Sequence, residues 1–295
     1  MKSYFCFNRI FAGVIILVLV VTCFFACSKS TESASPNANQ ADNLTINAAA
    51  DQAIVSGIYD DLFGIALEVG AKNGMNQAGG RKANIDLTAK LGSCAVAEID
   101  DVSAGQWPKV MLIKFGAQCA DATGRVRAGN IQVTYSNFFY YPNATITIKP
   151  LSYTVNGIAV QGTKVITNLS SNSEYKYSAV INDGVLKLDT VTVSYKSNRT
   201  IKQTDGLSTL LDVTDDVFSI FGTDSLIYPN GTAAAITVGE ADALERRIEC
   251  PWFSKGKALV TVGNISANVN YGNGVCDDSA SIDLGDKVKS IKLPK

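Results

Sequence analysis

The feature that most constrains the fold is a long stretch of strand-like sequence over residues 81–293. Apolar and polar residues alternate in segments such as 145–148, 187–195 and 258–262, where Val, Ile, Thr and Tyr are frequent. This period of two is typical of strands with one buried face. Because no helical segment separates these strands, the sequence predicts a mainly β fold, an antiparallel meander sheet or sandwich, rather than β-α-β units.

Tight turns are marked along this stretch by dipeptides that favour positive φ angles. Residues 145–197 accordingly look like three or four long consecutive strands. The predicted turns are Asn156-Gly157, Asp183-Gly184, Asp205-Gly206, Asn230-Gly231 and Asn273-Gly274.

One amphipathic helix is predicted before the strands, from residue 47 to about residue 71. Apolar residues recur there at steps of three and four, and acidic residues occupy the opposite face. Gly70 and the pair Asn73-Gly74 are typical of a helix end. We expect the apolar stripe to pack on the sheet, with binding of a partner as the alternative. The stripe is Ile54, Ile58, Leu62, Ile65 and Val69, and the acidic residues are Asp51, Asp60, Asp61 and Glu68.

The strand region holds four cysteines, Cys94, Cys119, Cys250 and Cys276. An even number is expected of a chain exported to an oxidising compartment. Similar separations and similar flanking residues favour the pairs Cys94–Cys119 and Cys250–Cys276 among the three possible pairings. In both cases a strand ends at Gly shortly before the second cysteine, and Asp follows that cysteine. This likeness predicts two similar disulfide-stapled hairpins, with chance similarity as the alternative.

The N-terminus has the pattern of a secretory signal. Lys2 and Arg9 precede an unbroken apolar run over residues 10–26. As a helix this run would extend roughly 25 Å, less than the ~30 Å core of a bilayer. A basic start, a short apolar run and a small residue before the cleavage point together indicate a signal peptide over residues 1–26, with an uncleaved membrane helix as the alternative.

The residues at the cleavage point, Phe24-Phe25-Ala26-Cys27, resemble the lipobox of bacterial lipoproteins, with Phe24 in the place where Leu is usual. The resemblance implies that Cys27 becomes the lipidated first residue of the mature chain. Acyl chains would then hold the protein on a membrane, because each buried methylene contributes about 0.8 kcal/mol.

The mature chain is expected to contain three parts. Residues 27–46 comprise the lipidated Cys27 and a flexible tether rich in Ser, Asn and Ala. The helix and the main antiparallel region occupy residues 47–240. A C-terminal β-hairpin repeat follows over residues 241–295, continuous with the main domain.

Composition excludes several classes of function. The chain has no histidine, which removes imidazole bases and every His-containing metal site. Its 26 basic and 27 acidic side chains leave a net charge of −1, which argues against nucleic-acid binding. Phosphate-binding loops, dinucleotide-binding motifs and nucleophile-elbow motifs are missing from the sequence. We therefore expect no catalytic residue, no metal and no cofactor.

The densest aromatic cluster, Phe138, Phe139, Tyr140 and Tyr141, is the candidate ligand-binding site. Four consecutive aromatic residues break the alternation, so some of them must face outward or lie at a strand end. Outward rings could stack on a glycan or bind an apolar ligand, whereas burial in the core is the alternative. Tyrosines on neighbouring strands that could extend the patch are Tyr153, Tyr175, Tyr177 and Tyr195.

Other clusters of charge are interpreted as surface features. Adjacent acids such as Asp60-Asp61 are assigned to helix surface or solvated loops, since a glycosidase needs two carboxylates that face each other across a cleft. A Ca²⁺ loop over residues 212–216 lacks the usual ligand pattern. The basic spots Arg125-Val126-Arg127 and Arg246-Arg247 are assigned to solvated or ion-paired surface.

Several segments together resemble a family of β-rich lipoproteins of the Bacteroidota type. The resemblance covers most of the mature chain and implies a location and a fold, without an activity. The segments are Cys27-Ser28-Lys29 and residues 115–119, 129–135, 155–157, 162–168 and 271–277.

We therefore expect a non-catalytic lipoprotein of the bacterial cell envelope, attached through its lipid to the outer membrane rather than the inner membrane, with a binding or scaffolding role. The first alternative is a carrier or sensor of an apolar ligand or glycan, and the second is a carboxylate-based glycan hydrolase. A carrier requires an apolar trough, a hydrolase requires acids that converge in a cleft, and a scaffold has a filled core.

Overall fold

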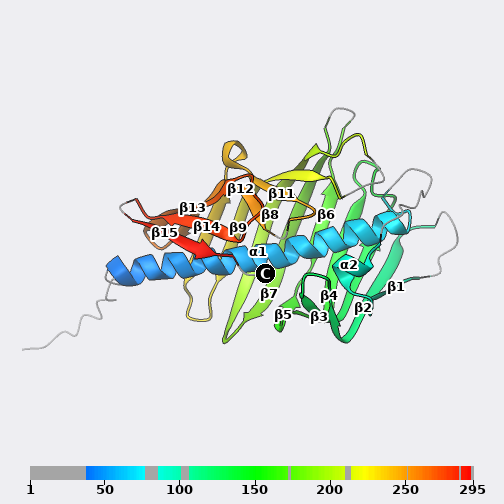
Figure 1. Ribbon diagram of the computed structural model, residues 1–295, viewed down its shortest axis with the longest axis horizontal. Helices are drawn as coiled ribbons and strands as arrows, with labels where there is room; N and C mark the ends of the chain where they lie inside the picture. The colour runs from blue at the N-terminus through cyan, green and yellow to red at the C-terminus, as the bar shows by residue number, and fades with distance from the viewer. Residues whose placement is uncertain are drawn as a thin grey trace, which may run out of the picture. The chain divides into compact units, whose positions relative to one another are not determined.

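The computed structural model describes residues 38–76, 86–100, 106–171, 174–209, 214–250, 252–285 and 287–293. They belong to one compact unit, Pro36–Lys295. In the described residues, this unit contains a long helix α1 (Ala38–Lys72), a short helix α2 (Thr88–Leu91), a 3-10 helix η2 (Glu240–Asp242) and a 15-stranded antiparallel sheet (Figure 1). The predicted signal peptide, Cys27 and the first part of the predicted tether lie outside the described residues.

The strands follow one another along the chain with short connections. Their bounds are β1 (Val96–Ile99), β2 (Lys109–Ala120), β3 (Val126–Tyr135), β4 (Thr145–Val155), β5 (Ile158–Gln161), β6 (Lys164–Asn168), β7 (Lys176–Leu188), β8 (Val191–Asp205), β9 (Val217–Ile227), β10 (Ala233–Val238), β11 (Leu244–Arg247), β12 (Phe253–Val262), β13 (Ile265–Asn273), β14 (Ser279–Asp283) and β15 (Val288–Lys292).

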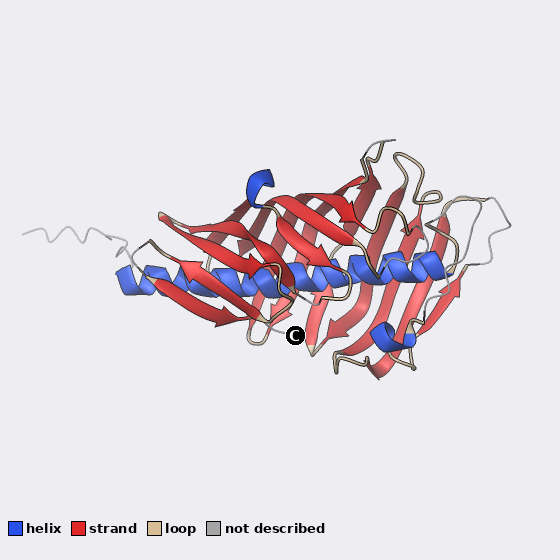
Figure 2. Cartoon of the chain, turned by 45° about the horizontal axis from the view of Figure 1, so that its top comes forward, coloured by secondary structure: helices blue, strands red, loops and turns tan. Residues whose placement is uncertain are grey.

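The sheet is a meander, as the sequence predicts. Its strand order is β1-β2-β3-β4-β5-β7-β8-β9-β10-β12-β13-β14-β15, with β6 paired to β4 and β7 and β11 paired to β9 and β12. Helix α1 contacts β4 from one half of the sheet and β12 and β13 from the other half. Figures 1 and 2 show α1 crossing the strands, with strands of the single curved sheet on more than one side of it.

Tyrosines on the inner face of the sheet form hydrogen bonds with α1. The Tyr135 hydroxyl donates to the Ala66 carbonyl at 2.7 Å, and the Tyr271 hydroxyl donates to Gln52 Oε1 at 3.2 Å. In the opposite direction, the hydroxyl of Tyr59 on α1 donates to the Gln161 carbonyl of β5 at 2.5 Å. A buried hydroxyl that keeps a partner avoids the cost of an unsatisfied polar group, so these bonds fix the position of the helix.

The helix differs from its prediction at its N-terminal end, whereas its C-terminal end is confirmed to within one residue. It begins at Ala38 rather than at residue 47, so residues 38–46 of the predicted tether are helical. Gly and Pro are absent from residues 38–56, and the side chain of Thr45 is already buried, so the helix continues through a polar segment. It passes through Gly70 and ends at Lys72, where Gly74 adopts a φ of 77°.

The predicted turns at residues 156–157, 205–206, 230–231 and 273–274 lie at strand ends, whereas the turn at Asp183-Gly184 is wrong. That pair lies inside β7, where the register with β8 shifts between Ile181 and Gly184. A Cβ at Gly184 would lie 2.8 Å from the hydroxyl of Tyr59. The glycine therefore serves a close approach of the helix to the sheet, which local turn propensity does not reveal.

Both predicted disulfides are present. Cys94–Cys119 has a Cα–Cα distance of 5.7 Å and Cys250–Cys276 has one of 5.8 Å. The first encloses the pair β1–β2 and the second encloses the pair β12–β13, so each staples one antiparallel pair. One detail is wrong, because β2 does not end at Gly116. It continues to Ala120 through a register shift at that glycine, which has a φ of 66°.

Candidate functional site

A cavity of about 360 Å³ lies along one side of α1, and it is the candidate site. Its walls come from α1, from α2 with the β2–β3 turn, and from β8, β9 and β11. The charged lining residues are Asp60, Asp61, Glu68, Asp86, Lys90, Asp121, Arg125, Arg127, Arg246 and Glu249, and the large apolar ones are Phe63, Ile201, Phe218, Ile220 and Ile248.

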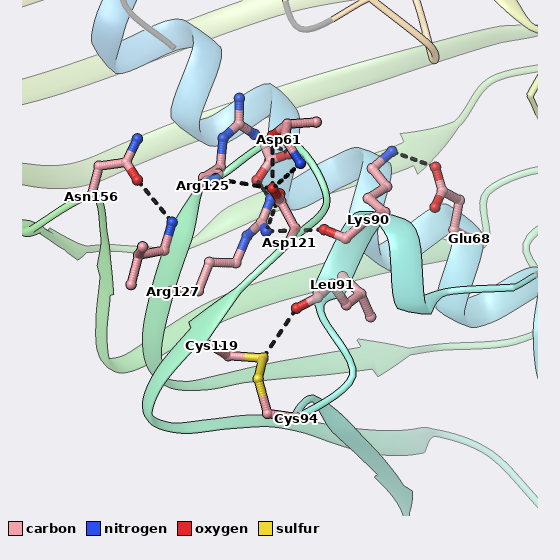
Figure 3. A network of polar contacts seen from close by, with 12 residues as sticks. Asp61, Glu68, Lys90, Leu91, Cys94, Cys119, Asp121, Arg125, Arg127 and Asn156 are labelled. Carbon is pink, nitrogen blue, oxygen red and sulfur yellow. Dashed lines mark hydrogen bonds and ion pairs between the residues drawn. A yellow bond between two sulfur atoms is a disulfide. The ribbon is translucent and has the colours of Figure 1, made fainter.

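Asp61 of α1 is the centre of the charged wall (Figure 3). Its Oδ1 lies 2.5 Å from Arg125 Nη1, and its Oδ2 lies 2.9 Å from Arg127 Nη2. Burial alone would raise the pKa of Asp61, but the guanidinium groups of Arg127 and Arg125 outweigh it and hold that pKa at about 2. The carboxyl group therefore stays ionised throughout the neutral range.

Arg127 of β3 connects Asp61 to the β2–β3 turn. Its side chain is fully buried, and its Nη1 donates to Asp121 Oδ2 at 2.8 Å and to the Lys90 carbonyl at 3.0 Å. Asp121 Oδ1 in turn accepts the backbone N–H groups of Thr123 and Arg125 at 2.9 and 3.0 Å. This local Asx arrangement shapes the turn, so the sequence itself places a carboxylate beside Arg127.

The first disulfide supports the same wall. Cys94 lies three residues after the end of α2, and Cys119 precedes Asp121 by two residues. The bond therefore ties the segment after α2, which carries Lys90, to the end of β2, directly before the turn that carries Asp121. Lys90 Nζ also forms a short ion pair with Glu68 of α1, which is part of the network drawn in Figure 3. Burial raises the pKa of Glu68, and the charge of Lys90 opposes this only in part.

A second group of ion pairs extends the charged wall under α1. Asp60 Oδ1 lies 2.8 Å from Lys164 Nζ of β6, and Asp60 Oδ2 lies 3.6 Å from Arg199 Nη1 of β8. Arg199 also donates its Nε to Asp224 Oδ1 of β9 at 2.9 Å, and the Gln52 amide of α1 donates to Asp224 Oδ2 at 3.1 Å. Although burial opposes it, the carboxylate of Asp224 raises the pKa of Arg199 well above its ordinary value.

A smaller cavity of about 90 Å³ adjoins the first one. Asp61, Arg125 and Arg246 line both cavities. The remaining lining of the smaller cavity is mostly apolar: Ala53, Ile54, Gly57, Ile58, Val155, Asn156, Ile158, Trp252, Phe253, Tyr271 and Leu293.

The assignment of the charged clusters to the surface is wrong at three places. Asp60 and Asp61 lie inside the fold, because the curved sheet covers the acidic face of α1 as well as its apolar stripe. Arg127 is fully buried, and Arg246 lines the cavities while its neighbour Arg247 is exposed. One feature of the sequence could have indicated that these charges are buried. Acidic residues and arginines both occur in segments whose pattern is otherwise typical of buried structure, so the opposite charges could neutralise one another.

The aromatic cluster lies away from the cavity, in the connection between β3 and β4. Phe139 is buried and stacks on Tyr177 with a centroid distance of 5.2 Å, whereas Tyr140 and Tyr141 are 37% and 43% exposed. The run therefore sits at a strand end with rings facing both ways, as its broken alternation indicates. The predicted extension is wrong for Tyr153 and Tyr195, which are buried in the core beneath α1.

Two further observations concern membranes and metals. None of the helices in the described ranges is long and apolar enough to span a bilayer. Within the same ranges, no group of three Cys, Asp or Glu side chains is close enough to hold a metal ion.

No family model, curated protein or solved structure matches this chain.

Proposed function

We propose that this protein is a lipid-anchored protein of the bacterial envelope that binds a small ligand in the cavity along α1 without transforming it. The cavity carries this proposal. Its volume of about 360 Å³ falls within the range of small-molecule sites, which are typically mostly apolar with a few fixed polar groups. We favour binding over scaffolding because a scaffold needs only a filled core, whereas this protein has a cavity.

The ion pairs support binding rather than catalysis. Asp61, which has a pKa of about 2, cannot donate a proton near neutral pH, and its two oxygens already face Arg125 and Arg127. Burial raises the pKa of Glu68, but the ammonium group of Lys90 is in direct contact with it and favours the charged form. Carboxylates held in this way provide a rigid polar wall that can orient a ligand.

The anchor is supported by the N-terminal sequence. The apolar run and Cys27 resemble a lipoprotein signal, and two disulfides fit a chain folded outside the cytosol. We place the cavity-bearing body at the outer membrane, tethered through the residues between Cys27 and α1.

Native mass spectrometry of the mature protein, extracted from its own membranes, tests the binding function. We expect a population that carries a small non-covalent ligand. Ile201→Trp should abolish this population by filling the cavity, since Ile201 lines its apolar wall. The matched control is Ala235→Trp, at an exposed position on β10. Equal ligand occupancy in both variants, or an empty wild-type protein that also takes up no added dodecanol, would overturn the proposal.

A further inference from the structure

A group of four aromatic side chains lies at the strand ends where β2 begins, β3 ends and β4 begins. This aromatic platform consists of Trp107, Phe138, Tyr140 and Tyr141. Trp107 packs edge-on against Phe138 with a centroid distance of 4.8 Å. Phe138 lies 6.1 Å from Tyr140 and 6.3 Å from Tyr141. We propose that the aromatic platform is a second binding site, separate from the cavity, which binds a neutral glycan by packing against one of its sugar rings.

The backbone beneath the aromatic platform is fixed by hydrogen bonds. The Phe139 N–H donates to the Met75 carbonyl at 2.8 Å, and the side-chain amide of Asn168 donates to the Phe139 carbonyl at 2.7 Å. The Phe139 ring is buried and stacks on Tyr177. Because the connection is held from below, the outward rings lose little conformational freedom when a ligand binds.

The side chains of this connection favour an uncharged ligand with hydroxyl groups. Residues 136–144 contain no Asp, Glu, Lys or Arg, so an ionic ligand finds no opposite charge there. Each exposed Tyr ring offers an apolar face with a hydroxyl at its edge, and the neighbouring Asn143 is exposed. A pyranose ring has the complementary chemistry, since it carries C–H groups on its faces and hydroxyl groups around its edge.

The size of the exposed rings matches one sugar residue. Tyr140 is 37% exposed and Tyr141 is 43% exposed, and their centroids are 4.1 Å apart. An aromatic side chain has roughly 150–250 Å² of surface, so the two rings together expose about 120–200 Å². A standard protein interface needs about 800 Å² from each partner. The two tyrosine rings are also tilted by 35°, which disfavours a long flat chain lying across both.

The position of the aromatic platform favours a glycan over the lipid surface. The hydrogen bond to Met75 places the platform beside the C-terminal end of α1, which ends at Lys72. The lipid anchor, which is part of the function proposed above, precedes the N-terminal end of the same helix. The 35 residues of α1 extend about 50 Å. This displacement from the attachment point favours contact with envelope polysaccharide.

Saturation-transfer NMR tests glycan binding by the mature chain with Cys27→Ala, which needs no detergent. The probes are three neutral tetrasaccharides: cellotetraose, maltotetraose and chitotetraose. We expect at least one of them to bind, with the strongest transfer to the C–H protons of a single sugar residue. The double variant Tyr140→Ser with Tyr141→Ser should weaken that binding at least tenfold. Leu259→Ser is the matched control, because Leu259 is 41% exposed on β12.

Two single variants distinguish packing on a ring from a general apolar contact. Tyr141→Phe keeps the ring and should retain the affinity within about threefold, whereas Tyr141→Leu keeps only an apolar side chain and should lose about fivefold. Equal affinities of the Phe and Leu variants would overturn the assignment to a sugar ring.

The remaining outcomes separate the aromatic platform from the cavity and from the membrane. Ile201→Trp should leave glycan binding unchanged, because Ile201 lines the cavity, so failure of the cavity function and failure of the aromatic platform give different results. Binding of none of the tetrasaccharides, or equal binding by the double variant and the wild type, would overturn the proposal. Sedimentation of the Cys27→Ala chain with vesicles of phosphatidylethanolamine and phosphatidylglycerol, lost in the double variant, would overturn it in favour of a membrane contact.

Discussion

Arg127→Met is the sharpest test of the buried ion pairs. The substitution keeps an unbranched apolar side chain of similar length but leaves Asp61 and Asp121 without their shared cation. Both carboxylates are buried, and Arg127 lies 2.9 Å from Asp61 and 2.8 Å from Asp121. Removal of one partner from a buried pair costs about 3–5 kcal/mol, because a buried charge loses its compensation; here Asp121 loses its ion pair, whereas Asp61 keeps Arg125 at 2.5 Å. We therefore expect the free energy of unfolding to fall by that amount at pH 7.

The pKa of Asp61 gives an independent magnitude. It lies at about 2 in the folded protein against 3.8 for an ordinary Asp, a difference of nearly two units. At 1.36 kcal/mol per unit, this corresponds to about 2 kcal/mol of stabilisation. Because the folded pKa is lowered, this stabilisation is fully present above about pH 4 and is lost as the pH falls through 2. Arg127→Met should raise the pKa of Asp61 and thereby move the loss of stability to higher pH.

Urea denaturation followed by circular dichroism measures both effects, with disulfides intact. Lys114→Met is the matched control, since Lys114 lies on the neighbouring strand β2 and forms an exposed ion pair with Glu98 at 2.6 Å. Such a pair contributes at most about 1 kcal/mol. The double variant Asp61→Leu with Arg127→Met should lose much less stability than the sum of its single variants. Equal small losses for Arg127→Met and Lys114→Met would refute the reasoning.

Three further changes have distinct expected results. Gly57→Ala should stabilise the protein by up to about 1 kcal/mol in urea denaturation, because the added Cβ meets open space in a helix; a loss of stability would contradict the geometry. Replacing both Cys94 and Cys119 by Ala should reduce the free energy of unfolding by roughly 3 kcal/mol, and an unchanged midpoint would show that the staple is unimportant. Cys27→Ala should move the protein from the membrane fraction to the soluble fraction; continued membrane association, measured by fractionation and intact mass, would rule out the lipid anchor.

Much of the fold follows from local sequence. Alternation predicts the antiparallel meander because long strands such as β4 and β8 have one buried face, and the similar flanks of Cys119 and Cys276 predict the correct cysteine pairs. The predictions that were wrong concern residues whose roles depend on segments distant in the sequence. Asp183-Gly184 resembles a turn by itself, yet it lies within β7, where Tyr59 of α1 approaches Gly184 closely.

The candidate site was not predictable in the same way. Asp60 and Asp61 look like the solvent face of an amphipathic helix until the sheet curves around both faces of α1. Their cations come from β3, β6 and β8, and sequence periodicity does not show which strands reach a given turn of the helix. Arg246 and Arg247 illustrate the limit most simply, because neighbours in one strand face the cavity and the solvent respectively.

Photo-crosslinking tests the location of the ligand most directly. A twelve-carbon fatty acid with a diazirine near the end of its chain is bound to the mature protein, irradiated, and located by peptide mapping. We expect labels on the peptides that contain Phe63 and Phe218, and their loss when excess dodecanoate competes. Labels confined to exposed apolar positions such as Tyr141 or Val275 would contradict a ligand site between α1 and the sheet.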